Sequence, residues 1–306
     1  MSIVELHNIS KSFGNVQALQ NITLEVDAGE LYGFIGPDGA GKTTLFRILT
    51  TLLTPDAGHG SVLDLDVVND YKEIRPKLGY MPGRFSLYQD LTVEENMQFF
   101  ASVFNTTIEE NYDLVKPIYS QLEPFKDRFA GNLSGGMKQK LALSCALIHK
   151  PELLLLDEPT TGVDAVSRKE FWEMLAMLKQ KGITIVVSTP YMDEAEKCDR
   201  VALIDKGKIL RVDTPAHVIS SFQKTLYGIK HPSKYALITA LREYPYAETV
   251  QPFGEFVHYT DSRGTFSVED IQDFLSSKNI VNAGIRPISA NVEDVFMRLM
   301  EAESNE

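Results

Sequence analysis

Residues 36–44, which read GPDGAGKTT, have the spacing Gly, four residues, Gly-Lys-Thr. They lie between an apolar run, Leu31 to Ile35, and a helix-like stretch, Leu45 to Leu53. This is typical of a phosphate-binding loop, where backbone N–H groups point at phosphate oxygens and the next helix adds its positive dipole end. Lys42 would reach the β and γ phosphates of a nucleotide, and the Thr43 hydroxyl would ligate Mg²⁺. The predicted nucleotide-binding residues here are Gly36, Asp38, Gly39, Ala40, Gly41, Lys42, Thr43 and Thr44.

Two adjacent carboxylates follow a second apolar run. Residues 151–160 read PELLLLDEPT, so a fully apolar strand ends in Asp157 and Glu158 before Pro159 stops it. Near a phosphate loop such a pair divides the work: one carboxylate steadies Mg²⁺ and the other activates the attacking water. Asp157 fits the first role and Glu158 the catalytic one, while a solvated acidic turn is the structural alternative.

A third motif places a serine and paired glycines directly before a helix. Residues 132–140 read NLSGGMKQK, and apolar residues follow at helical spacing. The serine and the glycine N–H groups could form an anion site at the helix start, or the serine could simply cap the helix. The candidate residues are Leu133, Ser134, Gly135, Gly136 and Met137.

The elements around these motifs indicate an α/β fold. Strand-like runs at Leu153 to Leu156, Ile183 to Ser188 and Val201 to Ile204 alternate with helix-length segments, which favours a parallel sheet. Alternating apolar residues between Ile3 and Val26 predict an antiparallel β region before the phosphate loop. Residues 87–132 predict a helical insert, with Thr92 as the N-cap of one helix.

The pattern changes after about residue 222, so we predict one domain over residues 1–222 and a second over 223–306. In the second, strand-like and helical segments follow in the order βαββαβ, which suits a small ferredoxin-like α+β unit. A final helix is expected from about Val292 to Met300.

The composition excludes several classes of protein. The chain has 306 residues, a net charge of −12 and a pI near 5.1, which disfavours a nucleic-acid-binding surface. It contains neither an apolar stretch of membrane-helix length nor a signal-peptide pattern, so a soluble cytoplasmic protein is expected. Cys145 and Cys198 lack the spacing of a metal site or a disulfide framework.

Together, the ordered motifs of residues 3–222 resemble those of the ATP-binding subunit of an ABC transporter. The resemblance implies a P-loop NTPase cassette that binds ATP and Mg²⁺ and hydrolyses ATP. It also implies that Phe13, in KSFG, stacks on adenine beside Val16, and that the D-loop aspartate, Asp164, contacts a partner cassette. In this family two cassettes sandwich two ATP molecules head to tail, so the Walker motifs of one chain meet the LSGGM-type signature of the other.

The implied partners are a second cassette and separate transmembrane permease subunits, which would hold the chain at the inner face of the cell membrane. ATP-driven closure is expected to move coupling helices of the permease that dock after Tyr80. Phe85, Leu87 and Tyr88 are docking candidates, and local core packing is the alternative.

Two positions depart from the family pattern. The family places glutamine after GYMP, where this chain has Gly83, and histidine after the strand of residues 183–188, where this chain has Pro190. Proline offers neither a side-chain hydrogen bond nor a backbone N–H, although it suits the first turn of a helix over residues 191–196 with Thr189 as N-cap. We therefore expect slow or impaired hydrolysis in this chain's own site, a signature that completes a partner's site, and a heterodimer in preference to a homodimer. In this respect the chain resembles the first cassette of two-cassette bacterial exporters.

Two other function classes stay open. One is a non-hydrolytic, regulatory ATP-binding subunit. The other is an ABC-fold ATPase that acts on ribosomes or DNA, although such proteins usually carry two cassettes or a long charged linker. The C-terminal domain resembles an accessory domain of exporter cassettes, with a dimerisation or regulatory role, and His231 and His258 are isolated in its sequence.

Overall fold

The computed structural model describes residues 1–304, which form two compact units. Met1–Val218 and the segment from Phe296 onward make up the first unit, and Ile219–Val295 make up the second. The predicted division at residue 222 assigned the whole chain end to the second domain, whereas the structure groups the end of the last helix with the first unit. Phe296, where this segment begins, has a side chain that is only 3% exposed. No helix within residues 1–304 combines the length and apolar character needed to cross a membrane.

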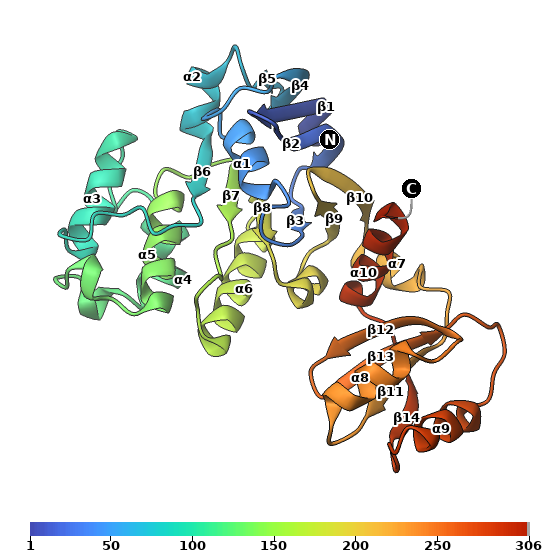
Figure 1. The fold of residues 1–306 in the computed structure, drawn as a ribbon. Coiled ribbons are helices and arrows are strands. Elements are labelled where there is room, and N and C mark those ends of the chain that lie inside the picture. The colour runs from blue at the N-terminus through green and yellow to red at the C-terminus, as the bar shows by residue number, and fades with distance from the viewer. Residues whose placement is uncertain (305–306) are drawn as a thin grey trace. The chain divides into compact units, whose positions relative to one another are not determined.

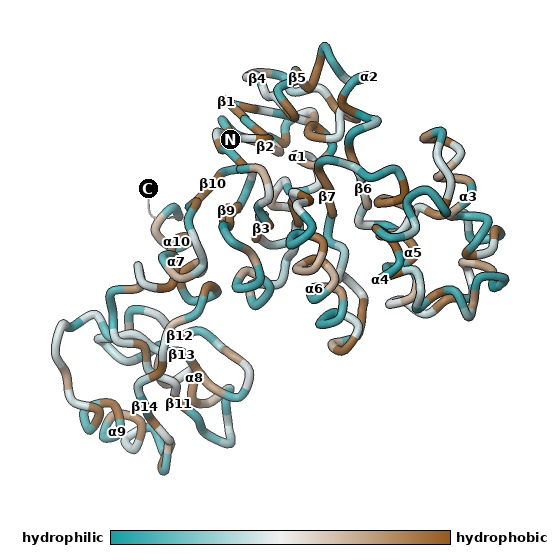
Figure 2. The backbone as a smooth tube through the Cα atoms, turned by 180° about the vertical axis from the view of Figure 1, so that it is seen from behind, coloured by the Kyte–Doolittle hydropathy of each residue, from teal (hydrophilic) through white to brown (hydrophobic). Residues whose placement is uncertain are grey.

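A six-stranded mixed sheet carries the predicted motifs. Its strands are parallel except for the edge strand β10, and the order is β10-β9-β3-β8-β7-β6. Their bounds are β3 (Leu31–Ile35), β6 (Leu78–Met81), β7 (Leu153–Asp157), β8 (Thr184–Thr189), β9 (Arg200–Asp205) and β10 (Lys208–Asp213). β3, β7 and β8 are buried along their whole length, as central strands covered on both faces should be. Figure 2 shows the corresponding hydrophobic runs along β7 and β9.

An antiparallel sheet lies beside the first helix (Figure 1). Its order is β2-β1-β4-β5, with bounds β1 (Ser2–Phe13), β2 (Val16–Asp27), β4 (Ala57–Val62) and β5 (Leu65–Asp66). The apolar pairs Leu6↔Leu24 and Ile9↔Ile22 lie opposite each other, so the predicted alternation is confirmed. These side chains share one core with helix α1 and with one face of the mixed sheet.

The helical insert is confirmed between β6 and the signature helix. The helices of the first unit are α1 (Lys42–Leu49), α2 (Tyr71–Ile74), α3 (Val93–Val103), α4 (Tyr112–Tyr119), α5 (Gly135–Leu147) and α6 (Ala165–Gln180), with α7 (Pro215–Ser220) at the unit boundary. Short 3₁₀ helices are η1 (Arg75–Lys77), η2 (Glu123–Phe125), η3 (Ala130–Asn132) and η4 (Met192–Lys197). Thr92 caps α3 in a capping box, in which its hydroxyl accepts from the Glu95 N–H and the Glu95 carboxylate accepts from the Thr92 N–H.

The second unit has the predicted ferredoxin-like order. β11 (Leu226–Lys230), α8 (Lys234–Arg242), β12 (Ala247–Phe253), β13 (Phe256–Asp261), α9 (Val268–Ser277) and β14 (Gly284–Ile288) follow one another along the chain. The sheet order is β12-β13-β11-β14 and every pairing is antiparallel. Helix α10 (Val292–Ser304) starts in this unit and ends in the first.

Candidate functional site

The glycines of the loop between β3 and α1 are required by close backbone approaches. A Cβ on Gly36 would lie 2.0 Å from the Ile204 carbonyl oxygen, and one on Gly41 would lie 2.4 Å from the Ala18 carbonyl oxygen. Gly41 also has a φ of +103°, which L side chains rarely adopt. Gly41 is the N-cap of α1 and no side chain caps this helix, so its first N–H groups are available to an anion.

Lys42 is already engaged on three sides within the protein. Its Nζ donates to the carbonyl oxygens of Gly36 at 2.7 Å and Pro37 at 2.9 Å, and pairs with Glu158 Oε1 at 3.1 Å. An ammonium has three N–H donors, and the Lys42 side chain is only 2% exposed. A phosphate that reaches this lysine must therefore replace at least one of these contacts.

The carboxylate pair at the end of β7 is held by Ser188 on the neighbouring strand. The Ser188 hydroxyl donates to Asp157 Oδ1 at 2.6 Å, while the Glu158 N–H donates to Ser188 Oγ at 2.9 Å. Glu158 has a left-handed φ of +50°, which is strained for a non-glycine residue. Its backbone is therefore fixed where its side chain meets Lys42, an arrangement suited to a general base.

Ser188 was absent from the sequence-predicted site residues. The parallel register pairs it directly with Asp157, and β8 ends beside β7 at the carboxyl edge of the sheet. The polar pair Ser188 and Thr189, which follows the apolar residues of β8 at the carboxyl end of the strand, was the signal that could have identified it.

A cavity of about 480 Å³ opens beside these groups. It is lined by Val16, Gln17, Ala18, Gln20, Gly39, Gly41, Lys42, Thr43, Thr44, Glu158 and Lys206. The cavity brings five of the predicted phosphate-loop residues and Glu158 together with Val16 from β2. Its lining does not include Gly36, Asp38, Ala40 or Asp157, and Asp157 is buried and hydrogen-bonded to Ser188.

The donor set fits a magnesium–nucleotide complex. Mg²⁺ at such sites usually keeps several waters and takes one or two protein oxygens besides the phosphates. Thr43, which carries a hydroxyl, lines the cavity, and Asp157 supplies a buried carboxylate next to Glu158 in the chain. These two residues supply the one or two protein oxygens that Mg²⁺ needs when phosphates and waters complete its coordination.

Phe13 lies at the end of β1, outside the cavity lining, with 48% of its surface exposed. The Lys11 ammonium lies 5.8 Å from its ring centroid and pairs with Asp56. The ring is thus accessible at the hairpin that also carries Val16.

The signature lies away from this cavity. Ser134 is the N-cap of α5 and accepts from the Met137 N–H at 3.3 Å, which confirms the capping alternative for its side chain. Ser134 and Gly135 are exposed. A Cβ on Gly136 would lie 2.5 Å from Ser167 Oγ, so this glycine also allows α5 to approach α6.

Asp164 begins the neighbouring helix α6. Its carboxylate accepts from the N–H groups of Val166 at 3.1 Å and Ser167 at 3.0 Å. These hydrogen bonds, those from Ser167 foremost, lower the pKa of Asp164 below its ordinary value. The signature and the D-loop thus present two exposed helix starts on one surface of the chain.

The two departed positions, Gly83 and Pro190, follow the carboxyl ends of β6 and β8, the two strands that pair with β7. A Cβ on Gly83 would lie 3.0 Å from the Asp157 carbonyl oxygen, so the backbone there runs against the carboxylate turn without a side chain. The helix predicted over residues 191–196 with Thr189 as N-cap is wrong: the segment is the 3₁₀ helix η4, with Tyr191 at the N-cap. Thr189 is the last residue of β8, and Pro190 follows the strand directly. Because proline has no backbone N–H, Pro190 cannot continue the hydrogen-bond ladder of the sheet.

A buried carboxylate holds the segment around Pro190. Glu194 is 3% exposed and accepts from the hydroxyls of Thr160 at 2.9 Å and Thr189 at 2.5 Å. Arg168 on α6 approaches it at 3.5 Å and lies over the Tyr191 ring at 4.5 Å. Sequence reasoning missed this cluster, because it joins three segments that only the fold brings together.

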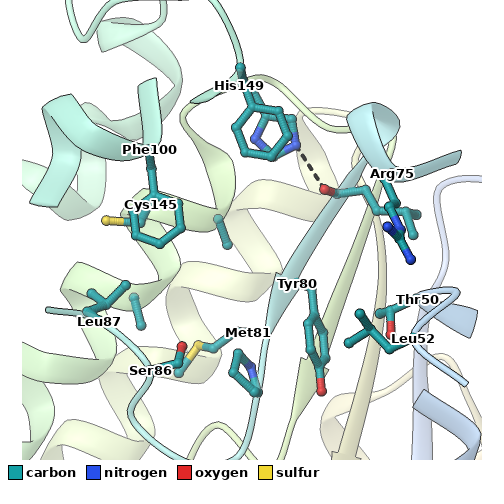
Figure 3. Close-up of a pocket in the computed structure, with 15 residues that line it drawn as sticks. Thr50, Leu52, Arg75, Tyr80, Met81, Ser86, Leu87, Phe100, Cys145 and His149 are labelled. Atoms are coloured by element: carbon teal, nitrogen blue, oxygen red, sulfur yellow. Dashed lines mark hydrogen bonds between the residues drawn. The ribbon is translucent and has the colours of Figure 1, made fainter. Parts of the chain in front are cut away.

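A second cavity of about 270 Å³ lies between the end of β6 and the helical insert (Figure 3). His149 closes one end: its Nε2 lies 2.9 Å from the Leu78 carbonyl oxygen and its ring stacks on Phe104. Burial, with the Asp157 charge as a smaller cause, raises the pKa of Tyr80 in this wall to about 12. The other lining residues are Thr50, Leu52, Arg75, Met81, Pro82, Ser86, Leu87, Phe100, Ala142, Cys145 and Ala146.

Of the predicted docking residues, Leu87 is buried and lines this cavity. Phe85 and Tyr88 are outside its lining. The Lys138 ammonium lies 5.4 Å from the Phe85 ring centroid, and the half-exposed Tyr88 ring packs edge-on against Phe99. Local packing therefore occupies part of each candidate side chain.

Comparisons with known proteins agree with this architecture. A family model described as ABC transporter matches residues 19–161. The Nod factor export ATP-binding protein I of Burkholderia lata is 35% identical over 98% of this chain and 97% of its own length. A probable multidrug ABC transporter ATP-binding protein of Escherichia coli K12, YbhF, is 39% identical over 70% of this chain, but the match spans only 37% of YbhF.

Solved structures match the first unit. The structure of an ATP-binding subunit of an ABC transporter has a TM-score of 0.65 at 27% identity, covering 72% of this chain and 93% of that one. A dimeric post-hydrolysis structure of the cassette MJ0796, bound to ADP and Pi, has a TM-score of 0.62 at 26% identity, with coverage of 69% and 98%. With its phosphate loop, carboxylate pair and signature on this fold, the chain belongs to the ABC transporter family of ATP-binding subunits, the ABC ATPases.

Proposed function

We propose that this chain binds Mg-ATP in one half-site and uses its signature to complete a second half-site on a partner cassette. The observation that carries the proposal is the separation of the two motif sets within one chain. Lys42, Thr43 and Glu158 line the 480 Å³ cavity, whereas Ser134 and Gly135 lie exposed outside its lining. A complete ATP site would therefore combine the cavity of one cassette with the signature of a second cassette.

In this proposal the protein's own groups divide the work. The loop glycines and the start of α1 hold the phosphates, Lys42 pairs with the β and γ phosphates, and Thr43 with Asp157 holds Mg²⁺. Glu158 accepts a proton from the attacking water, once nucleotide has displaced its contact with Lys42. Phe13 and Val16 hold the adenine, and Asp164 faces the partner.

We further propose that this chain's own site hydrolyses ATP slowly. Gly83 supplies no side chain and Pro190 no hydrogen-bonding group, so two contacts to the attacking water and the γ phosphate are missing. Loss of one preorganised contact commonly costs about 10² to 10³ in rate. The partner is therefore a different cassette with a complete site, and ATP-driven closure moves separate permease subunits of an export system.

The permease docks at the 270 Å³ cavity between β6 and the helical insert. Its apolar wall includes residues of the segment that follows Tyr80. The same segment contacts the turn at Asp157 through Gly83, which supports a role in coupling. This assembly places the chain in the cytoplasm, at the inner face of the membrane. The second unit would serve dimerisation or regulation.

Two substitutions in this chain test the proposal in a complex with the partner. Ser134→Asp keeps a side-chain cap for α5 but places a negative charge where the partner's phosphate would bind, so turnover should fall by at least about tenfold. Lys42→Met, which empties the chain's own site, should reduce turnover far less. If Lys42→Met abolished turnover and Ser134→Asp left it unchanged, the proposal would fail.

The second candidate is a regulatory subunit that binds ATP without hydrolysis in any complex. The missing groups at Gly83 and Pro190 favour it, and the retained Glu158 with its strained, fixed backbone speaks for residual chemistry. Measurable turnover in the complex, lost in the Ser134→Asp variant, would exclude this candidate.

A further inference from the structure

The turn between β9 and β10 brings a second lysine into the wall of the nucleotide cavity. Lys206 lines the cavity together with Lys42, Thr43 and Thr44, although it lies more than 160 residues further along the chain. The phosphate-loop pattern does not include it, and it was not among the sequence-predicted site residues.

The backbone fixes this turn against the phosphate loop. The Gly207 N–H donates to the Ala40 carbonyl oxygen at 3.0 Å, inside the loop itself. Gln20 adds two bonds, from its N–H to the Gly207 oxygen at 2.8 Å and from its side-chain amide to the Lys206 oxygen at 2.8 Å. The turn therefore has a defined place relative to Ala40 and to the start of α1.

Lysine is an unfavourable residue for this turn. Asp205 pairs with Lys208, so Lys206 and Gly207 form a two-residue hairpin loop with φ values of +44° and +76°. Such loops favour Asn-Gly, because asparagine tolerates positive φ better than a long side chain does. A residue kept in a disfavoured conformation beside a ligand cavity points to a role for its side chain.

The Lys206 ammonium has fewer and longer contacts within the protein than the Lys42 ammonium has. The Lys42 ammonium is bound by two carbonyl oxygens and by Glu158. The Lys206 ammonium has a distant carboxylate neighbour, Asp205, at 3.9 Å, and its side chain is 73% exposed. It can therefore turn toward an anion in the cavity without breaking a short contact that the structure shows.

We infer that Lys206 binds the polyphosphate of the nucleotide and is an additional nucleotide-binding residue of this chain. An ammonium recognises phosphate oxygens as a point charge. Lys206 provides electrostatic attraction before Lys42 exchanges Glu158 for a phosphate. This inference rests on nucleotide binding in the 480 Å³ cavity, as proposed above.

The test measures binding of ATP, ADP and adenosine to the full chain by calorimetry. The variants are Lys206→Gln, Lys206→Asn and Lys206→Arg, and Lys208→Gln is the matched control, since Lys208 lies two residues away and pairs with Glu303 at 4.0 Å. Lys206→Gln and Lys206→Asn should weaken ATP and ADP binding about three- to tenfold, and the loss should shrink at high salt. Adenosine binding should not change, and Lys206→Arg and Lys208→Gln should bind ATP within about twofold of the wild type.

Lys206→Asn separates the ligand role from the role in the turn. Asparagine suits the left-handed conformation, so this variant should unfold at the same temperature as the wild type or higher while it binds ATP more weakly. Wild-type ATP affinity in both Lys206→Asn and Lys206→Gln would overturn the inference, as would an equal loss of adenosine affinity. If the wild-type chain bound no nucleotide, the cavity assignment itself would fall and the inference with it.

Discussion

At the scale of residues, the nucleotide half-site rests on the contact between Lys42 and Glu158. Each group neutralises the other at 3.1 Å, and the left-handed backbone at Glu158 is held by two hydrogen bonds to Ser188. Phosphate must compete with this carboxylate for the lysine, so binding and positioning of the general base are linked.

Glu158→Gln should therefore bind ADP more tightly than the wild type, by about three- to tenfold. The substitution removes both the competing ion pair and the repulsion between carboxylate and phosphate. ADP avoids turnover during the titration, and calorimetry gives the affinity. Glu152→Gln, which alters an exposed pair with Lys77, is the control. Unchanged or weaker ADP binding by Glu158→Gln would contradict this account of the site.

Pro190→His should accelerate hydrolysis in this chain's own site, by about tenfold or more, because an imidazole can bond the γ phosphate where proline cannot. Turnover is measured in a complex whose partner carries an inactivated site. Pro190→Ala relaxes the backbone equally without adding an imidazole. Equal acceleration by both variants would assign the effect to the backbone and refute the role given to the missing histidine.

At the scale of elements, helix α3 holds the segment that follows Gly83. Asn96 is fully buried; its Oδ1 accepts from the Tyr88 N–H at 3.0 Å, and its Nδ2 donates to the carbonyl oxygens of Tyr88 at 3.0 Å and Thr92 at 2.9 Å. The same helix is capped by Thr92. The Asn96 side chain thus hydrogen-bonds to backbone groups of a loop whose Gly83 lies against the turn at Asp157 and Glu158.

Asn96→Ala should lower the free energy of unfolding by about 1–3 kcal/mol, since it removes the acceptor of the partly buried Tyr88 N–H and two further hydrogen bonds to this loop. Urea denaturation measures the change. Ser102→Ala on the exposed side of α3 serves as control and should have little effect. A stability loss no larger than that of the control would mean that water replaces the Asn96 amide in this loop.

Local patterns in the sequence predicted most of these elements. The period-two alternation of residues 3–26, the apolar central strands and the Thr92 cap depend on neighbouring residues, so each appears where it was predicted. The helix predicted from Tyr191 with Thr189 as N-cap was wrong. The geometry of this segment depends on Glu194, which is hydrogen-bonded to Thr160 on another segment. Ser188 and Lys206 reach the site through strand register and a hairpin, which no local spacing reveals.

At the scale of the whole molecule, the chain end returns to the cassette. Helix α10 begins in the second unit, and from Phe296 onward it belongs to the first, where Glu303 lies 4.0 Å from Lys208. A truncation after residue 222 therefore removes part of the cassette as well as the ferredoxin-like unit.

Two deletions distinguish these parts. Loss of residues 219–306 should lower the melting temperature of the cassette, because it removes the helix end from Phe296 onward that belongs to the cassette unit. The loss of one buried apolar side chain costs about 1.5–3 kcal/mol. Replacement of residues 219–295 by a Gly/Ser linker keeps this helix end and should leave the cassette's melting temperature nearly unchanged. Equal melting temperatures for both would show that the helix end adds no stability to the cassette.

The central claim is that this chain contributes a slow ATP site and a competent signature. It is tested most directly by purifying the chain with its partner cassette and measuring steady-state ATP turnover. In one complex Glu158→Gln is introduced, and in the other the corresponding glutamate of the partner is changed to glutamine. We predict that Glu158→Gln retains most of the turnover and that the change in the partner removes it. Loss of turnover with Glu158→Gln, together with full turnover after the change in the partner, would contradict the account.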